Sequence, residues 1–501
     1  MLFRIPIVAL ITFFGGLCCA EQPLRSAFAE RDITPEIGME RPGGYGKSFH
    51  RSIHDPCKVR ACVFDDGRQV VAVVSVDALL VRRQLVLGAR KRIAEKTEIK
   101  SEAILIHATH SHSSGPTGMI YPNEYDEAPE FIQELAYEHS SNANLGYVAH
   151  VEDQIVASVC EAFEERSECQ FSIGRGVEEN VAFNRRFVMT HGRTQTHPRP
   201  GNPEILRVAG PTDPEVGVIG VWNEGGELQG CIVNFACHAT ASPPGASANY
   251  IYFVEQVIRA VFGDEVVLVF LAGASGDITQ VENVTPFAAR NATESSRFVG
   301  GSIGAEVAKV LLREPKGVRA TIAYRSTVLR IPRRKPSVHR LKECEAIVDK
   351  EPTEVGRTTW TFAKEVLILD QRIKQEPIVD AEVQAIQIGP AILLTDPAEF
   401  FCQLGKDIKA GCEFPFVFPV SLANGCVGYV PTEEAFGPTG GGYETRLTSY
   451  SNLEITAGTQ LVEAAIDLSR KLSPSQTPVR GPASPFADNA WEYGAVPPEL
   501  K

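Results

Sequence analysis

The sequence predicts an α/β fold with a layered mixed β-sheet core that is flanked by helices. Two observations support this prediction. Apolar runs with the length of buried strands alternate with longer helical patterns over residues 25–311. The 501 residues are 44% hydrophobic, which is enough apolar mass for a large core. The expected strands are 70–76, 103–108, 230–236 and 266–271, and the expected helices are 84–95, 131–164 with a break, 252–262 and 302–312.

The rest of the chain divides into three parts. Residues 317–387 are more polar and predict an insertion or connecting layer with helices at 340–350 and 361–374. This layer carries a basic patch of Arg330, Arg333, Arg334 and Lys335. A second α/β portion follows over 383–472, and we expect its strands to complete the first sheet. After Ser473 the chain is rich in Pro, Ser, Gly and Ala, which predicts a flexible tail over 473–501.

The first twenty residues have the pattern of a secretory signal peptide. Arg4 precedes an almost purely apolar stretch over 5–14, and small residues follow up to Ala20. The stretch is too short to span a membrane. We therefore expect cleavage after Ala20 and export of the mature protein to the periplasm or the extracellular space.

Charge and cysteine usage limit the function classes. The formal net charge of −13 argues against a nucleic-acid-binding surface. Ten cysteines follow the expected signal peptide, and they are too sparse for a disulfide scaffold and form no Cys-x-x-Cys pair. Cys160–Cys169 and Cys412–Cys426 are the nearest options for disulfides, and the connectivity stays open.

Two histidines follow an expected buried strand. His110 and His112 stand after the apolar run 103–106, and a Ser/Gly/Pro exit over 113–116 ends the strand. Because side chains alternate along a strand, we expect both imidazoles to point the same way. Such a pair is suited to hold a metal ion or to transfer protons. The alternative is a polar loop with two solvated histidines.

Four later segments also place polar side chains where an apolar strand ends. His238 ends the strand over 231–236, and Ser275 stands in a Gly-rich turn after 269–272 that suits the close approach of a ligand. Glu399 follows the strand over 392–395 and is expected in the first turn of a helix. Tyr429 follows 422–428.

Each of these segments also has a simpler interpretation. His238 has the features of an ordinary loop residue, Glu399 would complement a helix dipole, and Tyr429 would be a packing residue with a satisfied hydroxyl. Ser275 suggests a serine hydrolase, but its context is Gly-x-Ser-Gly-Asp rather than Gly-x-Ser-x-Gly, and no clear base partner follows.

The order of the motifs resembles the neutral/alkaline ceramidase family over about residues 28–460. The motifs are Thr-His-x-His-Ser-x-Gly-Pro at 109–116, Asn-Phe-x-x-His-x-Thr at 234–240, Gly-Asp-Ile-Thr at 276–279, Pro-x-Glu-Phe at 397–400 and Leu-Ala-Asn-Gly-x-x-x-Tyr-Val-x-Thr-x-Glu at 422–434. Residues 32–35, 43–46 and 54–56 are similar to the start of that family.

The resemblance implies a ceramidase-like catalytic domain over 25–472 that works as a zinc amidase on the N-acyl bond of ceramide. Mapped onto the matching motifs, the Zn²⁺ ligands would be His110, His238, Glu399 and Tyr429. Around the metal, the catalytic residues would be His112, Arg185, Tyr443 and Thr279, the last where the family carries a serine.

The chain also departs from the family pattern. Thr279-Gln280-Val281 stands in place of Ser-Pro-Asn, the loop after His238 is shorter, and the chain leaves no room for the C-terminal immunoglobulin-like domain. The resemblance thus implies an exported zinc hydrolase of a ceramide-like or other N-acyl substrate, small molecule or lipid, with membrane contact and oligomeric state left open. The alternatives are a metal-dependent hydrolase of an unrelated ester or amide, and a non-catalytic binding protein.

Overall fold

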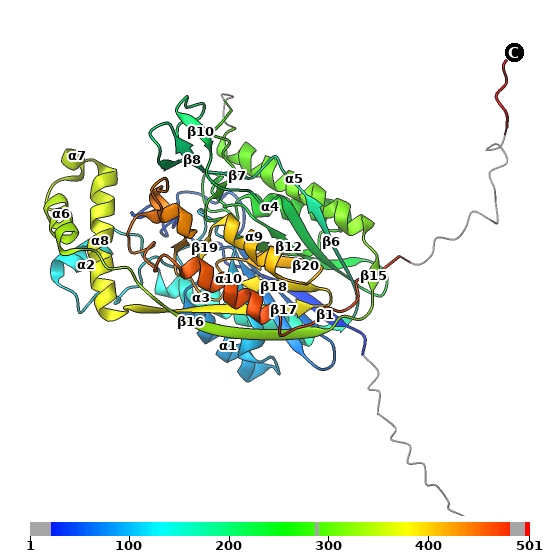
Figure 1. Ribbon diagram of the computed structural model, residues 1–501. Coiled ribbons are helices and arrows are strands. Elements are labelled where there is room, and N and C mark those ends of the chain that lie inside the picture. Colours follow the sequence, from blue (N-terminus) through cyan, green and yellow to red (C-terminus); the bar gives the residue numbers. More distant parts are fainter. Residues whose placement is uncertain (1–21, 286–289, 481–495) are drawn as a thin grey trace, which may run out of the picture.

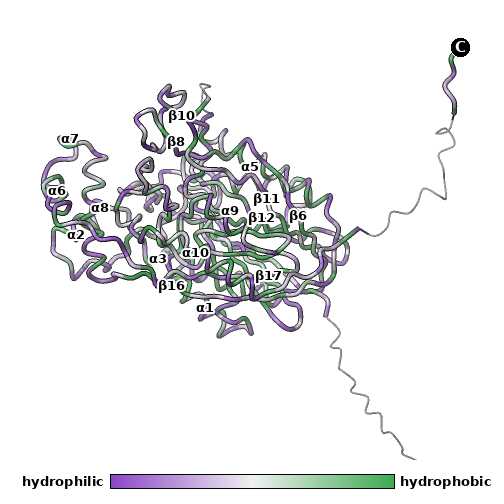
Figure 2. The backbone as a smooth tube through the Cα atoms, viewed as in Figure 1, coloured by the Kyte–Doolittle hydropathy of each residue, from purple (hydrophilic) through white to green (hydrophobic). Residues whose placement is uncertain are grey.

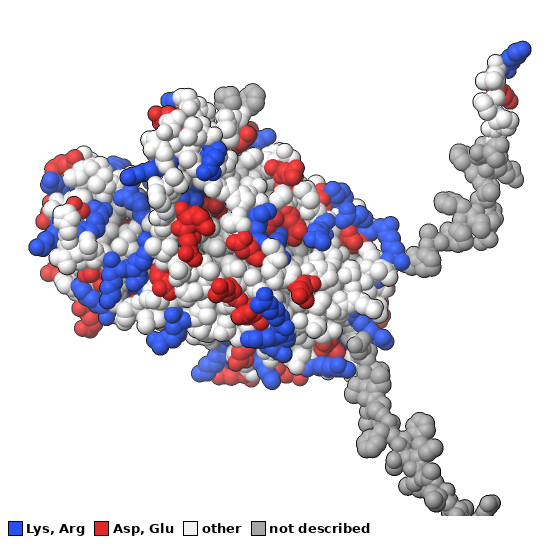
Figure 3. Space-filling view, in the orientation of Figure 1, with Lys and Arg blue, Asp and Glu red and all other residues white. Residues whose placement is uncertain are grey.

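The computed structural model describes residues 22–285, 290–480 and 496–501. Helices flank several mixed β-sheets, which confirms the predicted fold class (Figure 1). The expected signal peptide over 1–20 lies outside the described residues. Within the described ranges, no helix is both long and apolar enough to cross a membrane. Acidic and basic side chains are mixed over the face shown in Figure 3.

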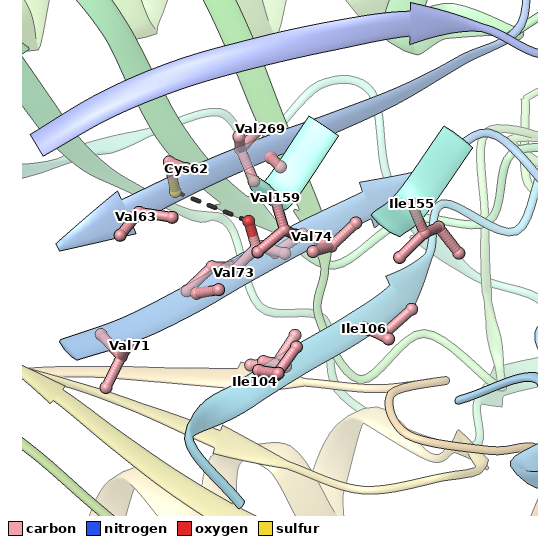
Figure 4. Close-up of a cluster of buried hydrophobic side chains, with 14 of the residues drawn as sticks. Cys62, Val63, Val71, Val73, Val74, Ile104, Ile106, Ile155, Val159 and Val269 are labelled. Atoms are coloured by element: carbon pink, nitrogen blue, oxygen red, sulfur yellow. Dashed lines mark hydrogen bonds between the residues drawn. The ribbon is translucent and has the colours of Figure 1, made fainter. Parts of the chain in front are cut away.

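The first sheet has the strand order β4-β3-β2-β1-β5, and α1 and α3 cover one of its faces. Its strands β3 and β4 are buried on both faces and therefore read as nearly continuous apolar runs. In Figure 4, Val73 of β3 and Ile106 of β4 pack near Ile155 and Val159 of α3, and the Cys62 thiol donates to the Val73 carbonyl at 3.6 Å. The elements are β1 Arg25–Asp32, β2 Lys58–Asp65, β3 Val70–Val76, β4 Ile104–Ala108, β5 Ser167–Glu168, α1 Arg83–Lys96 and α3 Leu145–Glu164.

The second sheet packs against the other face of the first, with the order β13-β12-β11-β6-β15. Helices α4 and α5 cover its outer face, so the body consists of four layers: helices, two sheets and helices again (Figure 1). Apolar residues concentrate in the inner layers (Figure 2). The elements are β6 Gln170–Val177, β11 Glu215–Trp222, β12 Leu228–Phe235, β13 Val267–Ala272, β15 Lys316–Gly317, α4 Tyr250–Phe262 and α5 Ala292–Arg313.

Helix α5 begins ten residues before the helix expected at 302–312. Asn291 and Glu294 form a reciprocal capping box that starts it. Its glycines allow close packing on α4, since a Cβ at Gly300 would lie 2.2 Å from the Tyr250 carbonyl oxygen. These glycines weakened the helical pattern in the sequence.

The prediction that the strands after 383 complete the first sheet was wrong. They form a third sheet, β16-β17-β18-β20, because β16 and β17 pair along their full length as an antiparallel ribbon. Helices α9 and α10 cover this sheet, and one bridge between His107 and Ala423 links it to β4. The elements are β16 Ile322–Pro332, β17 Ile378–Ile388, β18 Ala391–Thr395, β20 Phe416–Val420, α9 Cys402–Gly411 and α10 Ala457–Ser469.

The polar region around 340–375 forms a helical lobe at one end of the molecule, in yellow in Figure 1. Helix α8 packs against the other three helices of the lobe around a separate apolar cluster that contains Trp360 and Leu367. Part of the expected basic patch is internal, since Arg333 is buried and donates to Asn452 at 2.5 Å. The helices are α2 Glu130–Tyr137, α6 Val338–Val348, α7 Pro352–Val355 and α8 Arg357–Gln375.

Short elements complete the fold, and several of them carry site residues. They are the sheet of β7 Phe183–Asn184 and β14 Ile278–Thr279, the sheet of β8 Arg186–Met189, β9 Thr194–Thr196 and β10 Ile205–Val208, the sheet of β19 Glu399–Phe400 and β21 Tyr429–Val430, and the 3-10 helices η1 Ser101–Ala103, η2 Glu433–Phe436 and η3 Tyr443–Thr445.

The ten described cysteines are all free thiols, so neither Cys160–Cys169 nor Cys412–Cys426 forms a disulfide. The start of the expected tail contacts the body, because Gln387 donates to the Ser473 carbonyl at 2.7 Å.

Candidate metal centre

The candidate site lies where parallel strand pairs end. Each of the three large sheets contains one parallel pair, β3–β4, β12–β13 and β18–β20. His110 follows β4, His238 follows β12 and Glu399 follows β18. The carboxyl ends of parallel strands are a common place for ligand sites, because the chain leaves the sheet there in loops that can carry polar side chains.

His110 and His112 are close together, but not through strand alternation. His110 has a φ of 64°, so the chain has already left β4 in a left-handed turn, and the reason given for their proximity was wrong. Their Nε2 atoms lie 3.2 Å apart. Backbone hydrogen bonds from Ser111 to Ala78 and from His112 to Ala239 hold the turn in place.

His238 is oriented by a backbone carbonyl. Its Nδ1 lies 2.6 Å from the Ser275 carbonyl oxygen, and its Nε2 lies 3.0 Å from Oε2 of Glu399. Burial, followed by the charge of Arg185, lowers the pKa of His238 to about 4, so the ring is neutral near pH 7. The serine-hydrolase interpretation gains no support, since His238 contacts the carbonyl of Ser275 rather than its hydroxyl.

Glu399 lies on a short strand, not in a helix as expected. The strand β19 pairs in parallel with β21 so that Glu399 is opposite Tyr429, and α9 begins only at Cys402. This register brings the two expected ligands side by side. The Gly-rich turn at Gly276 packs directly against this strand. A Cβ at Gly276 would lie 2.3 Å from the Glu399 carbonyl oxygen, so the approach is possible because this residue is a glycine.

Several acceptor atoms converge at this point. His110 Nε2 lies 3.4 Å from Oε2 of Glu399, and its Nδ1 lies 2.8 Å from the Leu79 carbonyl. A carbonyl only accepts, so Nδ1 carries the proton in the neutral ring and Nε2 presents a lone pair. The same holds for His238. Oε2 of Glu399 is thus buried between two lone pairs and has no hydrogen-bond donor.

This arrangement fits a metal ion. Burial raises the pKa of Glu399, and a proton on Nε2 of His110 or His238 would bring it well below its usual range. With both Nε2 atoms deprotonated, a metal ion between them would supply the positive charge that keeps the carboxylate ionised. Two imidazole nitrogens and a carboxylate oxygen are a donor set that Zn²⁺ accepts, and the Nδ1 contacts to carbonyls orient the rings as in known zinc sites. His110, His112 and His238 also form a compact cluster in which one nitrogen of each ring lies within 4.8 Å of the other two.

Arg185 connects the tyrosines to the histidines. It follows Asn184 of β7 and donates to the Tyr429 hydroxyl at 3.2 Å and, over a long 3.4 Å contact, to His238 Nε2. Tyr443 lies beside it, with its hydroxyl 3.1 Å from that of Tyr429. Burial raises the pKa of both tyrosines, so their hydroxyls are protonated near pH 7.

Glu444 is a site residue to which the sequence analysis assigned no role. Its Oε1 accepts from Nε of Arg185 at 3.0 Å, and its Oε2 accepts from the Thr196 hydroxyl at 2.6 Å. The guanidinium also donates to the Gly276 carbonyl at 2.6 Å. The only signal in the sequence was its position directly after Tyr443.

The remaining expected site residues differ in their surroundings. His112 is the one partly exposed histidine of the three, and it lines an open hollow of about 360 Å³. The backbone packs tightly against its ring, since a Cβ at Gly43 would lie 2.5 Å from its Nδ1. Thr279 is buried in β14, where it pairs with Phe183. Among the described residues, the hydrogen bonds of the metal centre do not include its hydroxyl.

Comparison with known proteins identifies the fold. No protein-family model matches the sequence, and no curated protein matches it. Two solved structures are similar to this chain. One is a neutral ceramidase from Pseudomonas aeruginosa, with a TM-score of 0.65 and 19% identity over 92% of this chain and 77% of that one. The other is a ceramidase complexed with C2, with a TM-score of 0.64 and 18% identity over the same shares. The predicted resemblance to the ceramidase fold is thereby confirmed.

Proposed function

We propose that this protein is a zinc-dependent hydrolase that cleaves the amide bond of a ceramide-like or other N-acyl substrate. The observation that carries the proposal is the buried Oε2 of Glu399, which faces the lone pairs of His110 and His238 and has no donor. The ceramidase fold supports the same chemistry, since both similar structures are named as ceramidases.

In this proposal His110, His238, Glu399 and Tyr429 hold the zinc. Bound zinc would polarise the scissile carbonyl and make a water molecule acidic enough to react near neutral pH. Tyr429 is the least typical ligand, and it is supported by its position opposite Glu399 in the strand pair. A cluster of His110, His112 and His238 is the alternative ligand set.

The other residues would act on protons and charge. Burial lowers the pKa of His112 well below its usual range, so the ring is neutral near pH 7. A neutral ring has a nitrogen lone pair, through which His112 would take a proton from the attacking water and pass it to the leaving nitrogen. Arg185 is held rigidly by Glu444 and the Gly276 carbonyl, and its fixed positive charge would stabilise the negative charge that develops on the substrate oxygen. Tyr443 would add a second hydroxyl at the same oxygen. For Thr279, we propose a role in shaping the wall rather than in proton transfer, given its buried place in β14.

Metal analysis of three variants tests the proposal. We expect zinc in the wild-type protein and in His150→Ala, whose histidine is exposed on α3, and no zinc in His110→Ala. Hydrolysis of N-acyl substrates should fall below detection in His110→Ala and stay unchanged in His150→Ala. A wild-type protein without zinc, with His110→Ala behaving identically, would contradict the proposal.

His112→Ala separates the two ligand sets. If His112 only transfers protons, the variant keeps its zinc while the rate falls by roughly 10²–10⁴-fold. Loss of zinc from His112→Ala, together with retention in Glu399→Gln, would favour the three-histidine set instead.

A further inference from the structure

The hollow beside His112 has polar walls and one cationic side chain. Its volume is about 360 Å³, and Arg41, Ser48, His112, Thr240 and Ser242 contribute polar groups to it. The rest of the wall consists of glycines and Pro42. A long hydrocarbon chain would find little apolar surface here, because binding sites for such chains are lined mainly by hydrophobic and aromatic side chains.

Arg41 has no acidic partner. Its Nε donates to the His112 carbonyl at 3.1 Å, and its backbone N–H donates to Ser48 at 2.7 Å. Over the described ranges, no carboxylate lies within 4.0 Å of its guanidinium. Burial lowers the pKa of Arg41, but an arginine stays charged at neutral pH. Arg41 is half-buried, whereas the fully buried Arg60 and Arg185 each face a carboxylate.

The loop that carries Arg41 is firmly held. Lys364 of the helical lobe donates to the Tyr45 carbonyl at 2.8 Å, and the Tyr45 and Phe362 rings are 5.8 Å apart, edge to face. The guanidinium therefore has a fixed place beside His112, and a carboxylate could bind it without reorganising the loop.

We propose that Arg41 binds a carboxylate on the amine half of the substrate, which makes the substrate an N-acyl amino acid. This inference rests on the proposed function. There His112 passes a proton to the leaving nitrogen. Because His112 also lines the hollow, the proposal places the group attached to that nitrogen in the hollow that His112 and Arg41 share. The Nη atoms of Arg41 can donate to both oxygens of a carboxylate.

The reaction balances without a further reactant. The oxygen of water joins the acyl carbon, the carbon–nitrogen bond breaks, and both hydrogens of water go to the nitrogen. An N-acyl amino acid anion thus yields a fatty acid carboxylate and a zwitterionic amino acid. The carboxylate at Arg41 does not react, so its contact acts on binding and positioning.

Three substrates with one acyl chain test the proposal: N-lauroylglycine, N-lauroylglycinamide and N-lauroylsphingosine. The first two differ only in the charge that would face Arg41. We expect kcat/KM of the zinc-loaded wild-type protein to be highest for N-lauroylglycine. In Arg41→Gln, the ratio of kcat/KM for N-lauroylglycine to that for N-lauroylglycinamide should fall about 10- to 100-fold. Arg41→Lys should keep part of the preference.

Arg51→Gln is the matched control, because Arg51 is an exposed arginine in the same segment of the chain. It should leave the ratio unchanged. A ratio that is the same in the wild-type protein and in Arg41→Gln would overturn the proposal, as would a wild-type preference for N-lauroylsphingosine. If Arg41→Gln only disturbed His112, kcat/KM would fall for both N-lauroylglycine and N-lauroylglycinamide, and their ratio would stay the same. A change in the ratio therefore reports the loss of the carboxylate contact.

Failure of the proposed function gives a different result. If the zinc-loaded protein cleaves none of the three amides, calorimetric titration with N-lauroylglycine and N-lauroylglycinamide still tests Arg41. Tighter binding of the anion by the wild-type protein, lost in Arg41→Gln, would support the carboxylate site alone. Equal binding of both compounds would overturn it.

Discussion

Two buried groups of charged side chains in this molecule differ in whether their charges have partners. The first, the paired network, lies between β2, the end of β3 and α4 and consists of Arg60, Asp77, Glu255 and Lys58. Arg60 contacts Asp77 at 2.7 Å and Glu255 at 2.5 Å, and Lys58 contacts Glu255 at 2.7 Å. Burial would raise the pKa of Glu255, but Arg60 and Lys58 lower it to about 2.

The candidate metal centre is built differently. Glu399 is buried, as Glu255 is, yet its Oε2 faces two imidazole lone pairs instead of cations. A buried charge without a partner is costly, and proteins keep such an arrangement where a ligand supplies the missing charge. Buried charge alone therefore does not mark a functional site. Among the described residues, Glu399 is the one with a buried carboxylate oxygen that lacks a hydrogen-bond partner, and this charged acceptor is what distinguishes the candidate metal centre from the paired network.

The largest effect is expected when the paired network is broken. In Arg60→Met, Asp77 and Glu255 lose the cation between them, and the free energy of unfolding should fall by about 3–5 kcal/mol. Urea denaturation of the two proteins measures this difference. The control is Arg330→Met, because Arg330 forms an exposed pair with Asp380 and should contribute less than about 1 kcal/mol. An Arg60→Met protein as stable as the control would show that the network is not structural.

His107 sharpens the comparison, since it lies three residues from His110 but belongs to the framework. Its Nε2 accepts from the Ala272 N–H at 2.7 Å, which ties β4 to β13. Burial, with a smaller effect of His110, lowers the pKa of His107 to about 3. The unfolded chain, with a His pKa near 6.5, therefore binds more protons between pH 3 and 6.5. Stability that is fully present above pH 6.5 is lost as the pH falls through this window.

We expect this loss to reach about 1.5 kcal/mol between pH 6.5 and pH 5 for His107 alone. His107→Gln keeps an acceptor for Ala272 and removes the titrating ring. Urea denaturation at the two pH values should show a fall that is smaller in the variant by this amount. An equal fall in both proteins would mean that His107 does not contribute to the acid sensitivity.

The sequence predicted those parts of the molecule that depend on long apolar patterns. The strand at 70–76 matches β3, and the strand ends led to His110, His238 and Glu399, which the structure brings together. Strands buried between two layers give continuous apolar runs, and the polar residue that ends such a run is easily recognised.

Features set by short or backbone interactions were not predictable. The two-residue strands β19 and β21 are too short to show a period, so Glu399 was placed in a helix. The contacts that orient His110 and His238 come from the carbonyls of Leu79 and Ser275, which any residue could supply. The cationic hollow depends on Arg41, which sits far from His112 in sequence and follows no strand.

The smallest effect is expected for Glu399→Gln, and its sign decides the comparison. In the metal-free protein an amide at this position can donate to His238 Nε2 and removes a buried charge, so stability should stay equal or rise by about 1 kcal/mol. The same change at Glu255 should destabilise the protein, because Arg60 and Lys58 lose their partner.

Zinc at a hundred times its dissociation constant should add about 2.7 kcal/mol to the free energy of unfolding of the wild-type protein and less to that of Glu399→Gln. Thermal unfolding with a chelator and with zinc measures both effects. If Glu399→Gln weakens the metal-free protein as much as Glu255→Gln does, the carboxylate is a structural partner, and the unsatisfied acceptor does not mark a metal site.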